Sequence, residues 1–578
     1  MQNTLISFEN YTFQYRSQAE PTIHEINLQI HEGERVVIVG PSGCGKSTLA
    51  HCINGLNPFS YPGTSTGKLT VCGKEAAETG IFGLSKYVGT VLQDTDGQFI
   101  GMTVLEDIAF SLENDCVPQE EMRKRTYEEA QKVGLISKLD AAPHELSGGQ
   151  KQRVSMAGVL INRVPILLFD EPLANLDPAA GREAMELIDD LQKDHGSTVI
   201  VIEHRLEDAM HRGADRIILM EEGRIISDTT PTELFLSNRL IKAGIREPLY
   251  ITALKYAGVK LHKEMHLDRM QDLVLTEEEK QQVRDWSDAQ EEPPAKKKPE
   301  EVLTVEELCF GYTPEKENLS DISFSVSQGE MVSIVGKNGA GKSTLAKLLC
   351  GFVKQDNGII TLKGTDLANH TIKERACFIG YVMQNPNQMI SKPMIFDEVA
   401  MSLRLKGLPE EEVKEKVYKS LKICGLYQFR NWPINALSYG QKKRVTIASI
   451  LVQEPEIIIL DEPTAGQDFR HYTEIMEFLR ELNERGITVL MITHDMHLML
   501  EYTERSLVFS EGHMIADTTP AKLFSDTALL KRASLKETSL FDLAELCQLE
   551  PENYIEKFIA YDRQIRTSFK DMAAGGGK

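Results

Sequence analysis

VVIVGPSGCGKSTLA, residues 36–50, decides the fold of this chain, and VSIVGKNGAGKSTLA, residues 332–346, repeats it almost letter for letter. Each stretch is an apolar run followed by G-x4-G-K-S, the pattern of a glycine-rich loop between a strand and a helix. The glycines let successive main-chain N–H groups point at phosphate oxygens, and the start of the helix adds the positive end of its dipole. Two such matches predict two nucleotide sites.

Other phrases also occur twice, which indicates a duplication. ILLFDEPLANLD (166–177) returns as IIILDEPTAGQD (457–468), and LSGGQKQR (146–153) returns as LSYGQKKR (437–444). Because order and spacing are nearly preserved, we expect two homologous domains in tandem. In each half, short apolar strands alternate with helical stretches, which is typical of an α/β fold with a mostly parallel sheet. The predicted regions are a first domain at 1–244, a helical extension and charged linker at 245–302, a second domain at 303–525, and a C-terminal extension with a flexible tail at 526–578.

Composition and charge exclude several classes of protein. The formal net charge of -22 argues against attraction to nucleic acid or to an anionic lipid surface. Nine cysteines without CxxC spacing favour reduced thiols over a disulfide framework or a zinc site. The N-terminus has neither the basic nor the apolar region of a signal peptide, and no apolar run approaches the roughly 20 residues of a membrane span. We therefore expect any membrane role to act through another chain.

The loop lysines and serines predict contacts with a nucleotide and its metal ion. Lys46 and Lys342 are expected to reach the β and γ phosphates of ATP, and the hydroxyls of Ser47 and Ser343 are expected to bind Mg2+. The predicted ATP-binding loop positions are Gly40, Pro41, Ser42, Gly43, Cys44, Gly45, Lys46, Ser47 and Thr48 in the first half, and Gly336, Lys337, Asn338, Gly339, Ala340, Gly341, Lys342, Ser343 and Thr344 in the second.

Two carboxylates follow an apolar strand in each half. Asp170 and Asp461 end their strands at the carboxyl edge of the sheet, where they can hold Mg2+ through water. The next residues, Glu171 and Glu462, are placed to polarise an attacking water as general bases. The sequence thus predicts hydrolysis as well as binding.

The whole order of motifs resembles the nucleotide-binding domain of ABC ATPases, over about 1–240 and 303–525. This resemblance implies that each mostly parallel core carries an antiparallel β subdomain and a helical subdomain with the LSGGQ signature. It also implies further residue roles. These are adenine stacking by Tyr15 and Tyr312, contacts to Mg2+ and the attacking water by Gln93 and Gln384, contacts to the γ-phosphate by His204 and His494, and D-loop contacts across the dimer by Asp177 and Asp468.

ABC ATPase domains pair head to tail, so the resemblance implies that each signature covers the ATP held by the other domain. The loop at Lys46 would face the second signature, and the loop at Lys342 the first. Tyr439 occupies the position of Gly148, but because the serine and the next glycine remain, we favour a working site with an altered rate. The signature residues expected to bind ATP are Ser147, Gly149 and Gln150 in the first domain, and Ser438, Gly440 and Gln441 in the second.

Tandem ABC ATPases without membrane spans occur in at least three classes. Ribosome-associated ABC-F proteins have a long basic helical linker, whereas this linker is acidic with one short lysine run. Tandem sugar-import ATPases typically have a degenerate second site, which is complete here. The stretches 93–114 and 384–403, with LSYGQKKRV, IEHRLE and 244–259, resemble the ATPases of energy-coupling factor (ECF) transporters, particularly fused two-domain members.

The ECF resemblance implies partners and a location. ATP would close the two domains of one chain, and grooves near Gln98-Phe99 and Gln388-Met389 would contact a transmembrane T component. A small S component would bind a vitamin, a vitamin precursor or a metal ion for import. We therefore expect a peripheral ATPase on the cytoplasmic side of the cell membrane, with ATP and Mg2+ as cofactors and without a nucleic-acid partner.

Overall fold

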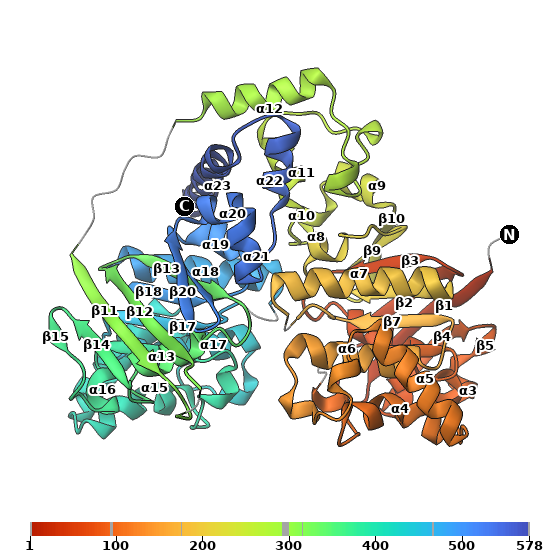
Figure 1. The fold of residues 1–578 in the computed structure, drawn as a ribbon, viewed down its shortest axis with the longest axis horizontal. Helices are drawn as coiled ribbons and strands as arrows, with labels where there is room; N and C mark the ends of the chain where they lie inside the picture. Colours follow the sequence, from red (N-terminus) through yellow and green to blue (C-terminus); the bar gives the residue numbers. More distant parts are fainter. Residues whose placement is uncertain are drawn as a thin grey trace. The chain divides into compact units, whose positions relative to one another are not determined.

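The computed structural model divides into two compact units that repeat one order of helices and strands (Figure 1). The structure describes residues 3–92, 96–174, 176–291, 300–314, 316–464 and 467–575. The first unit contains the described residues up to Trp286 together with 467–470, and the second contains the others. Within the described ranges, no helix combines the length and the apolar character needed to cross a lipid bilayer.

Two sheets form the first unit. A four-stranded sheet has the order β2-β1-β4-β5 and a six-stranded sheet has the order β10-β9-β3-β8-β7-β6. The neighbours in the first are antiparallel, while β3, β6, β7, β8 and β9 run parallel in the second and β10 is antiparallel to β9. The predicted α/β class, with an added antiparallel sheet, is confirmed. The strands are β1 (Thr4–Tyr15), β2 (Ile23–His31), β3 (Arg35–Val39), β4 (Gly63–Val71), β5 (Lys74–Glu75), β6 (Val88–Val91), β7 (Ile166–Asp170), β8 (Thr198–Ile202), β9 (Arg216–Glu221) and β10 (Arg224–Thr229).

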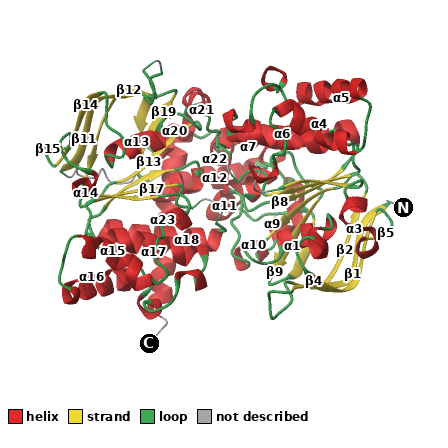
Figure 2. Cartoon of the chain, turned by 90° about the horizontal axis from the view of Figure 1, so that it is seen from below, coloured by secondary structure: helices red, strands yellow, loops and turns green. Residues whose placement is uncertain are grey.

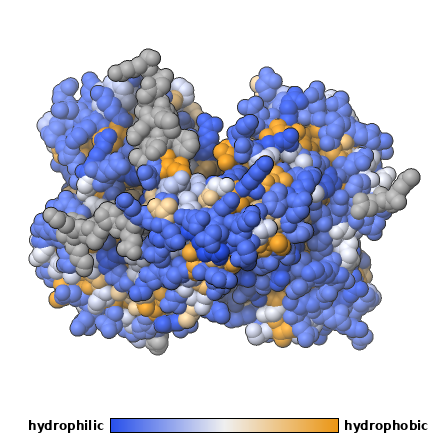
Figure 3. Space-filling view, turned by 90° about the horizontal axis from the view of Figure 1, so that it is seen from above, coloured by the Kyte–Doolittle hydropathy of each residue, from blue (hydrophilic) through white to orange (hydrophobic). Residues whose placement is uncertain are grey.

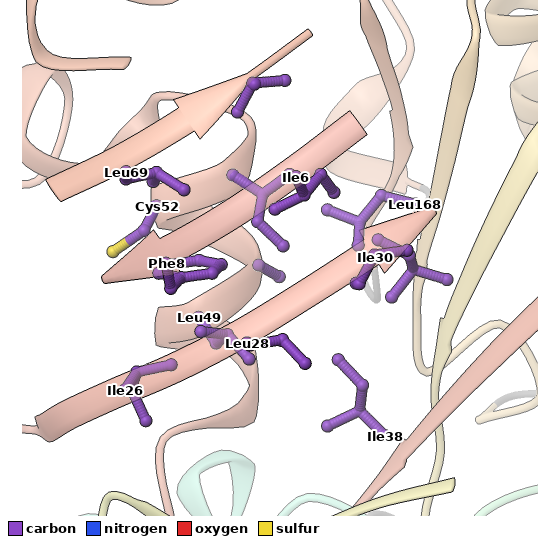
Figure 4. Close-up of a cluster of buried hydrophobic side chains, with 14 of the residues drawn as sticks. Ile6, Phe8, Ile26, Leu28, Ile30, Ile38, Leu49, Cys52, Leu69 and Leu168 are labelled. Carbon is purple, nitrogen blue, oxygen red and sulfur yellow. The ribbon is translucent and has the colours of Figure 1, made fainter. Parts of the chain in front are cut away.

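The main core of this unit lies between its two sheets, around helix α1. Figure 4 shows Phe8 from β1, Leu28 from β2 and Ile38 from β3 in one cluster with Leu49 and Cys52 from α1. All of these side chains are buried. Because α1 begins at the lysine of the glycine loop, packing of this helix also fixes the position of the loop.

Helices α4, α5 and α6 have a core of their own, and they group together in Figure 2. Ile108 and Leu112 of α4 pack there with Ala130 of α5 and with Val154 and Ala157 of α6. This group corresponds to the helical signature subdomain. The helices of the first unit and the adjoining segment are α1 (Lys46–Ile53), α2 (Leu56–Phe59), α3 (Ala76–Leu84), α4 (Val104–Asn114), α5 (Gln119–Lys132), α6 (Gly148–Leu160), α7 (Pro178–His195), α8 (Leu206–Ala209), α9 (Pro231–Leu236), α10 (Arg239–Lys242), α11 (Leu249–Tyr256) and α12 (Glu277–Ala289).

The second unit has the same two sheets, in the orders β12-β11-β14-β15 and β16-β17-β18-β13-β19-β20. Their shared core again includes the helix after the glycine loop. The strands are β11 (Glu301–Phe310), β12 (Leu319–Ser327), β13 (Met331–Gly336), β14 (Asn357–Leu362), β15 (Thr365–Asp366), β16 (Ile379–Val382), β17 (Ile457–Asp461), β18 (Thr488–Ile492), β19 (Arg505–Ser510) and β20 (His513–Thr518). The helices are α13 (Lys342–Leu349), α14 (Ile372–Arg375), α15 (Ile395–Leu405), α16 (Glu410–Ile423), α17 (Tyr439–Leu451), α18 (Phe469–Glu484), α19 (Met496–Tyr502), α20 (Pro520–Ser525), α21 (Thr527–Ala533), α22 (Ser539–Leu546) and α23 (Pro551–Gly575).

The duplication extends beyond the ATPase folds. Each unit closes its large sheet with a hairpin that ends in Asp-Thr-Thr-Pro, at 228–231 and at 517–520. In both, the second threonine caps a short helix, and two further short helices follow. Helix α23 contacts α19, α20 and α22 and continues to Gly575, so the described part of the expected flexible tail is helical.

The face drawn in Figure 3 is mainly hydrophilic, with separate hydrophobic patches among the charged side chains. This agrees with a chain in which 26% of the residues are charged. Single exposed apolar residues are ordinary on a protein surface. An exposed apolar patch indicates a contact surface only where several such residues lie together.

Candidate nucleotide sites

The two glycine loops have backbone conformations that require glycine. Gly45 and Gly341 have φ of 101° and 100°, in the left-handed region. A Cβ at Gly45 would lie 2.7 Å from Ile23 Cγ2, and a Cβ at Gly341 would lie 2.5 Å from Leu319 Cδ2. Any side chain would therefore move the loop away from the sheet.

Both loop lysines are buried and bound to their own loops. Lys46 Nζ donates to the carbonyl oxygens of Gly40 at 2.9 Å and Pro41 at 3.0 Å. Lys342 Nζ donates to the carbonyl oxygens of Gly336 at 2.7 Å and Lys337 at 2.9 Å. Each ammonium group is thus held inside the curve of main-chain N–H groups that would surround phosphate.

A serine hydroxyl meets the strand-ending aspartate in each unit. Ser47 Oγ donates to Asp170 Oδ1 at 3.3 Å, and Ser343 Oγ donates to Asp461 Oδ2 at 3.1 Å. Burial raises the pKa of Asp170 to about 6, against the lowering effect of the Ser47 hydroxyl. Hydroxyl and carboxylate oxygens are the ligands that Mg2+ prefers, so these pairs fit a magnesium ion.

The next residue turns back toward the histidine. Glu171 and Glu462 have φ of 50° and 45°, a left-handed conformation that costs a non-glycine residue about 1–3 kcal/mol. Glu171 Oε1 lies 2.9 Å from His204 Nε2, whereas Glu462 Oε1 lies 3.6 Å from His494 Nε2. Strain at the same position in both units is typical of a functional site.

The two glutamates differ in proton affinity. Burial acts to raise the pKa of Glu171, but the hydrogen bond and charge of His204 and the charge of Lys46 outweigh it, so the pKa is lowered. Burial raises the pKa of Glu462, with a further increase from the negative charges of Asp461 and Asp495. The same pair of residue types therefore has two electrostatic environments.

The signature residues begin helices α6 and α17. Ser147 Oγ accepts from the main-chain N–H of Gln150 at 3.4 Å, and Gln150 Oε1 accepts from that of Ser147 at 3.0 Å. Ser438 and Gln441 make the same reciprocal capping box at 3.3 and 3.0 Å. Each serine hydroxyl accepts in the cap and keeps its own hydrogen to donate to a phosphate.

The remaining predicted residues are placed as follows. Tyr15 is half-buried, its hydroxyl lies 3.2 Å from Thr48 Oγ1, and it lines a hollow of about 300 Å³. Tyr312 is 53% exposed. Gln384 is exposed, and Gln93 lies outside the described residues. The carboxylate of Asp177 caps α7, and Asp468 directly precedes α18. Adenine stacking and the D-loop roles remain predictions.

Three polar residues near the sites were not predicted from the sequence. Buried Glu203 accepts from the main-chain N–H groups of Leu173 at 2.8 Å and His204 at 3.0 Å, which holds the histidine turn next to the turn after β7. Tyr381 donates its hydroxyl hydrogen to Asp461 at 2.8 Å, and Lys443 is completely buried beneath the second signature. The available signal was a polar residue at an otherwise apolar position, as in TVIVIEH.

Comparisons with known proteins identify the family of this chain. A family model described as "ABC transporter" matches residues 23–174 and 319–465, and one described as "ATP-binding cassette cobalt transporter" matches residues 237–310. Proteins named as ABC transporter ATP-binding proteins are 59% identical in Enterococcus faecalis, 56% in Clostridium perfringens and 52% in Staphylococcus aureus. These matches cover 97–98% of this chain and 99–100% of each relative. A solved structure of cbiO1 from Clostridium perfringens, part of the cbiONQ transporter complex, is 34% identical over 40% of this chain and 94% of its own, with a TM-score of 0.38.

Proposed function

This chain belongs to the ABC transporter family as an ATP-binding protein with two ATPase domains, and from that premise we propose that it energises nutrient uptake by an ECF-type importer. ATP hydrolysis coupled to transport is the activity of this family. The proposed cargo class is a vitamin, a vitamin precursor or a metal ion. The proposed location is the cytoplasmic face of the membrane, where a T component and an S component complete the transporter.

The completeness of both nucleotide sites carries this proposal. Each unit has the loop lysine, the serine–aspartate pair and the glutamate–histidine pair in contact distances that fit hydrolysis. Two complete sites favour the ECF class over tandem sugar-import ATPases with a degenerate second site. The segment between the two domains supports the same choice. Residues 237–310 match a family model described as an ATP-binding cassette cobalt transporter, and a metal ion is one of the proposed cargo classes.

Each group of site residues has its own proposed role during hydrolysis. The main-chain N–H groups of the loop and its lysine bind the phosphates, and the glutamate carboxylate takes a proton from the attacking water. The histidine fixes the direction of that carboxylate, closely in the first unit and more loosely in the second. The signature serine donates its remaining hydroxyl hydrogen to the γ-phosphate held by the other domain.

Ser47 and Asp170, with Gln93, would hold Mg2+ in the first site, and Ser343 and Asp461 would hold it in the second with Gln384. When bound, this ion neutralises developing charge on the phosphate oxygens. The convergence of hydroxyl and carboxylate oxygens supports this assignment.

The T component is proposed to contact the loop before α4. Gln98 is turned inward, because its amide bonds Leu92 N–H and the Thr90 carbonyl at 3.3 and 3.4 Å. Ile100 and Met102 follow it and are 64% and 82% exposed. We therefore propose that Ile100 and Met102, which follow the expected groove at Gln98-Phe99, make the contact in the first unit, because exposed apolar residues suit a helix from a membrane protein.

Purification of the native complex from detergent-solubilised membranes tests this function. We expect a membrane-spanning T component and a small S protein to copurify, and Ile100→Glu with Met102→Glu to release them while ATPase activity remains. Exposed Ile136→Glu is the matched control, because this side chain lies outside the proposed contact and is 45% exposed. Recovery of ribosomes would instead select the ABC-F class, and recovery of the chain without membrane partners would contradict the transporter assignment.

A further inference from the structure

Helix α17 bonds to the main chain of the second unit at two points of the nucleotide site. The Tyr439 hydroxyl donates to the Gln384 carbonyl oxygen at 3.1 Å, and Lys443 Nζ donates to the same oxygen at 3.1 Å. Lys443 Nζ also donates to the Glu462 carbonyl oxygen at 3.2 Å. We call these three bonds the Gln384 clamp.

The clamp follows from the spacing of its two donors. Tyr439 and Lys443 are four residues apart, so they lie on the same face of α17. Gln384, at one end of the clamp, lies two residues after β16. Glu462, at the other end, directly follows β17, the strand that ends in Asp461. The clamp therefore connects the predicted water-contacting glutamine to the predicted base through one helix.

Lys443 is costly to keep in this position. Its side chain is fully buried, and burial lowers its pKa to about 8, against the raising effect of the Glu462 and Asp461 charges. An ammonium group in such a place is stable only when its donors are satisfied. The two carbonyl oxygens satisfy it, and charge-assisted bonds of this kind are stronger than neutral ones.

The first unit has different residues at both donor positions. Gly148 stands at the position of Tyr439 and has no side chain, and Gln152 stands at the position of Lys443. The Gln152 amide donates to the carbonyl oxygen of Pro172, directly after Glu171. The connection to the turn after β7 is thus a neutral bond in the first unit, and Gln93, the counterpart of Gln384, lies outside the described residues.

We propose that Tyr439 and Lys443 are positioning residues for hydrolysis at the nucleotide held by the second unit. The Gln384 clamp keeps the Gln384 and Glu462 main chains at a fixed separation, so that the amide and the carboxylate reach one water together. It acts on turnover, because neither donor lies in the glycine loop that binds the phosphates. This inference rests on the proposed general-base role of Glu462.

Single-site backgrounds of the full-length chain test the proposal. In Glu171→Gln, where Glu462 is the remaining base, Lys443→Gln should lower kcat about tenfold and Tyr439→Phe about threefold. The KM for ATP should stay within about twofold, because the phosphate contacts remain. In Glu462→Gln, where Glu171 is the remaining base, both changes should leave kcat within about twofold. Lys443→Gln introduces the residue that the first unit has at this position, so the change is conservative for the packing of α17.

Hydrogen exchange gives a second measurement that does not depend on activity. Lys443→Gln should speed amide exchange in peptides that cover 383–390, with unchanged exchange in 90–92 and 96–99 of the first unit. Equal loss of kcat in both backgrounds would overturn the proposal, since the helix would then act through its signature or through overall stability. Unchanged exchange at 383–390 would also overturn it. If the variant with both Glu171→Gln and Glu462→Gln still hydrolyses ATP, the general-base assignment is wrong. The exchange rate at 383–390 tests the Gln384 clamp independently of that assignment.

Discussion

The two nucleotide sites have the same principal residues but different surroundings. In the first, Glu171 lies 2.9 Å from His204 and has a lowered pKa, because the positive charges near it outweigh burial. In the second, Glu462 lies 3.6 Å from His494 and has a raised pKa, because burial and two negative neighbours favour the protonated form. Complete motifs therefore do not make equal sites, since the neighbouring charges and burial set the protonation of the proposed base.

The two aspartates that we propose to bind Mg2+ also have different surroundings. Asp170 accepts from the Ser47 hydroxyl, whereas Asp461 accepts from both Ser343 and Tyr381. Thr90 occupies the position of Tyr381 in the first unit and accepts from the Asn54 amide at 3.2 Å. Among the described residues, the second unit thus has an additional donor to its aspartate, while the first has the closer glutamate–histidine pair.

Removal of both bases should have the largest effect. Glu171→Gln with Glu462→Gln should lower the ATPase rate at least about a hundredfold, because an amide cannot accept the proton of water. ATP should still bind, since the loops are unchanged. Phosphate release and equilibrium ATP binding measure the two quantities, with the single variants as controls. Brisk hydrolysis by the double variant would show that another group is the base.

Removal of a signature hydroxyl should have the next largest effect and should identify which signature serves which site. If the sites are composite, Ser147→Ala should lower kcat about tenfold in Glu171→Gln, where the Lys342 loop holds the hydrolysed ATP. The same change in Glu462→Gln should have little effect, and Ser438→Ala should show the opposite preference. Preference for the site in the same domain would contradict head-to-tail pairing.

The pH dependence of the single variants should separate the two environments. A base works only when ionised, so a raised pKa moves the loss of activity on acidification to higher pH. Glu171→Gln, which depends on Glu462, should therefore lose activity closer to neutral pH than Glu462→Gln, which depends on Glu171. Profiles of kcat from mildly acidic to mildly alkaline pH measure this. Superimposed acid limbs would mean that nucleotide binding equalises the two glutamates.

The sequence predicted the fold correctly, and the structure brings the predicted lysine, serine, aspartate, glutamate and histidine of each half close together, for a physical reason. Phosphate binding needs glycines at positive φ before a helix, and an apolar run ending in Asp-Glu needs a buried parallel strand, so both leave local patterns. Ser47 and Asp170 are far apart in the chain, but the end of β7 and the start of α1 bring them together. This contact follows from the topology of the fold.

Other features left no such pattern. Tyr439 was recognised from the sequence as an unusual residue in the signature, but its bond to the Gln384 carbonyl depends on how a loop after β16 packs against α17. Lys443 stands in the basic run Lys442-Lys443-Arg444, and its burial depends on tertiary packing that one sequence does not reveal. The pKa difference between the two glutamates likewise depends on distances of a few ångströms.

Removal of the Tyr381 hydroxyl should have the smallest effect and should sharpen the comparison of the aspartates. Tyr381→Phe removes one hydroxyl donor from the Asp461 carboxylate, a charge-assisted bond of about 1.5–3 kcal/mol, and leaves the ring in place. Because this hydroxyl helps to orient the carboxylate, the Mg2+ concentration for half-maximal activity should rise about threefold in Glu171→Gln. It should not change in Glu462→Gln, where Asp170 would hold the metal of the active site, and Thr90→Val provides the matched change in the first unit. A local effect on Asp461 should change the Mg2+ requirement in Glu171→Gln alone. An equal change in both backgrounds would mean that Tyr381→Phe acts by destabilising the second unit.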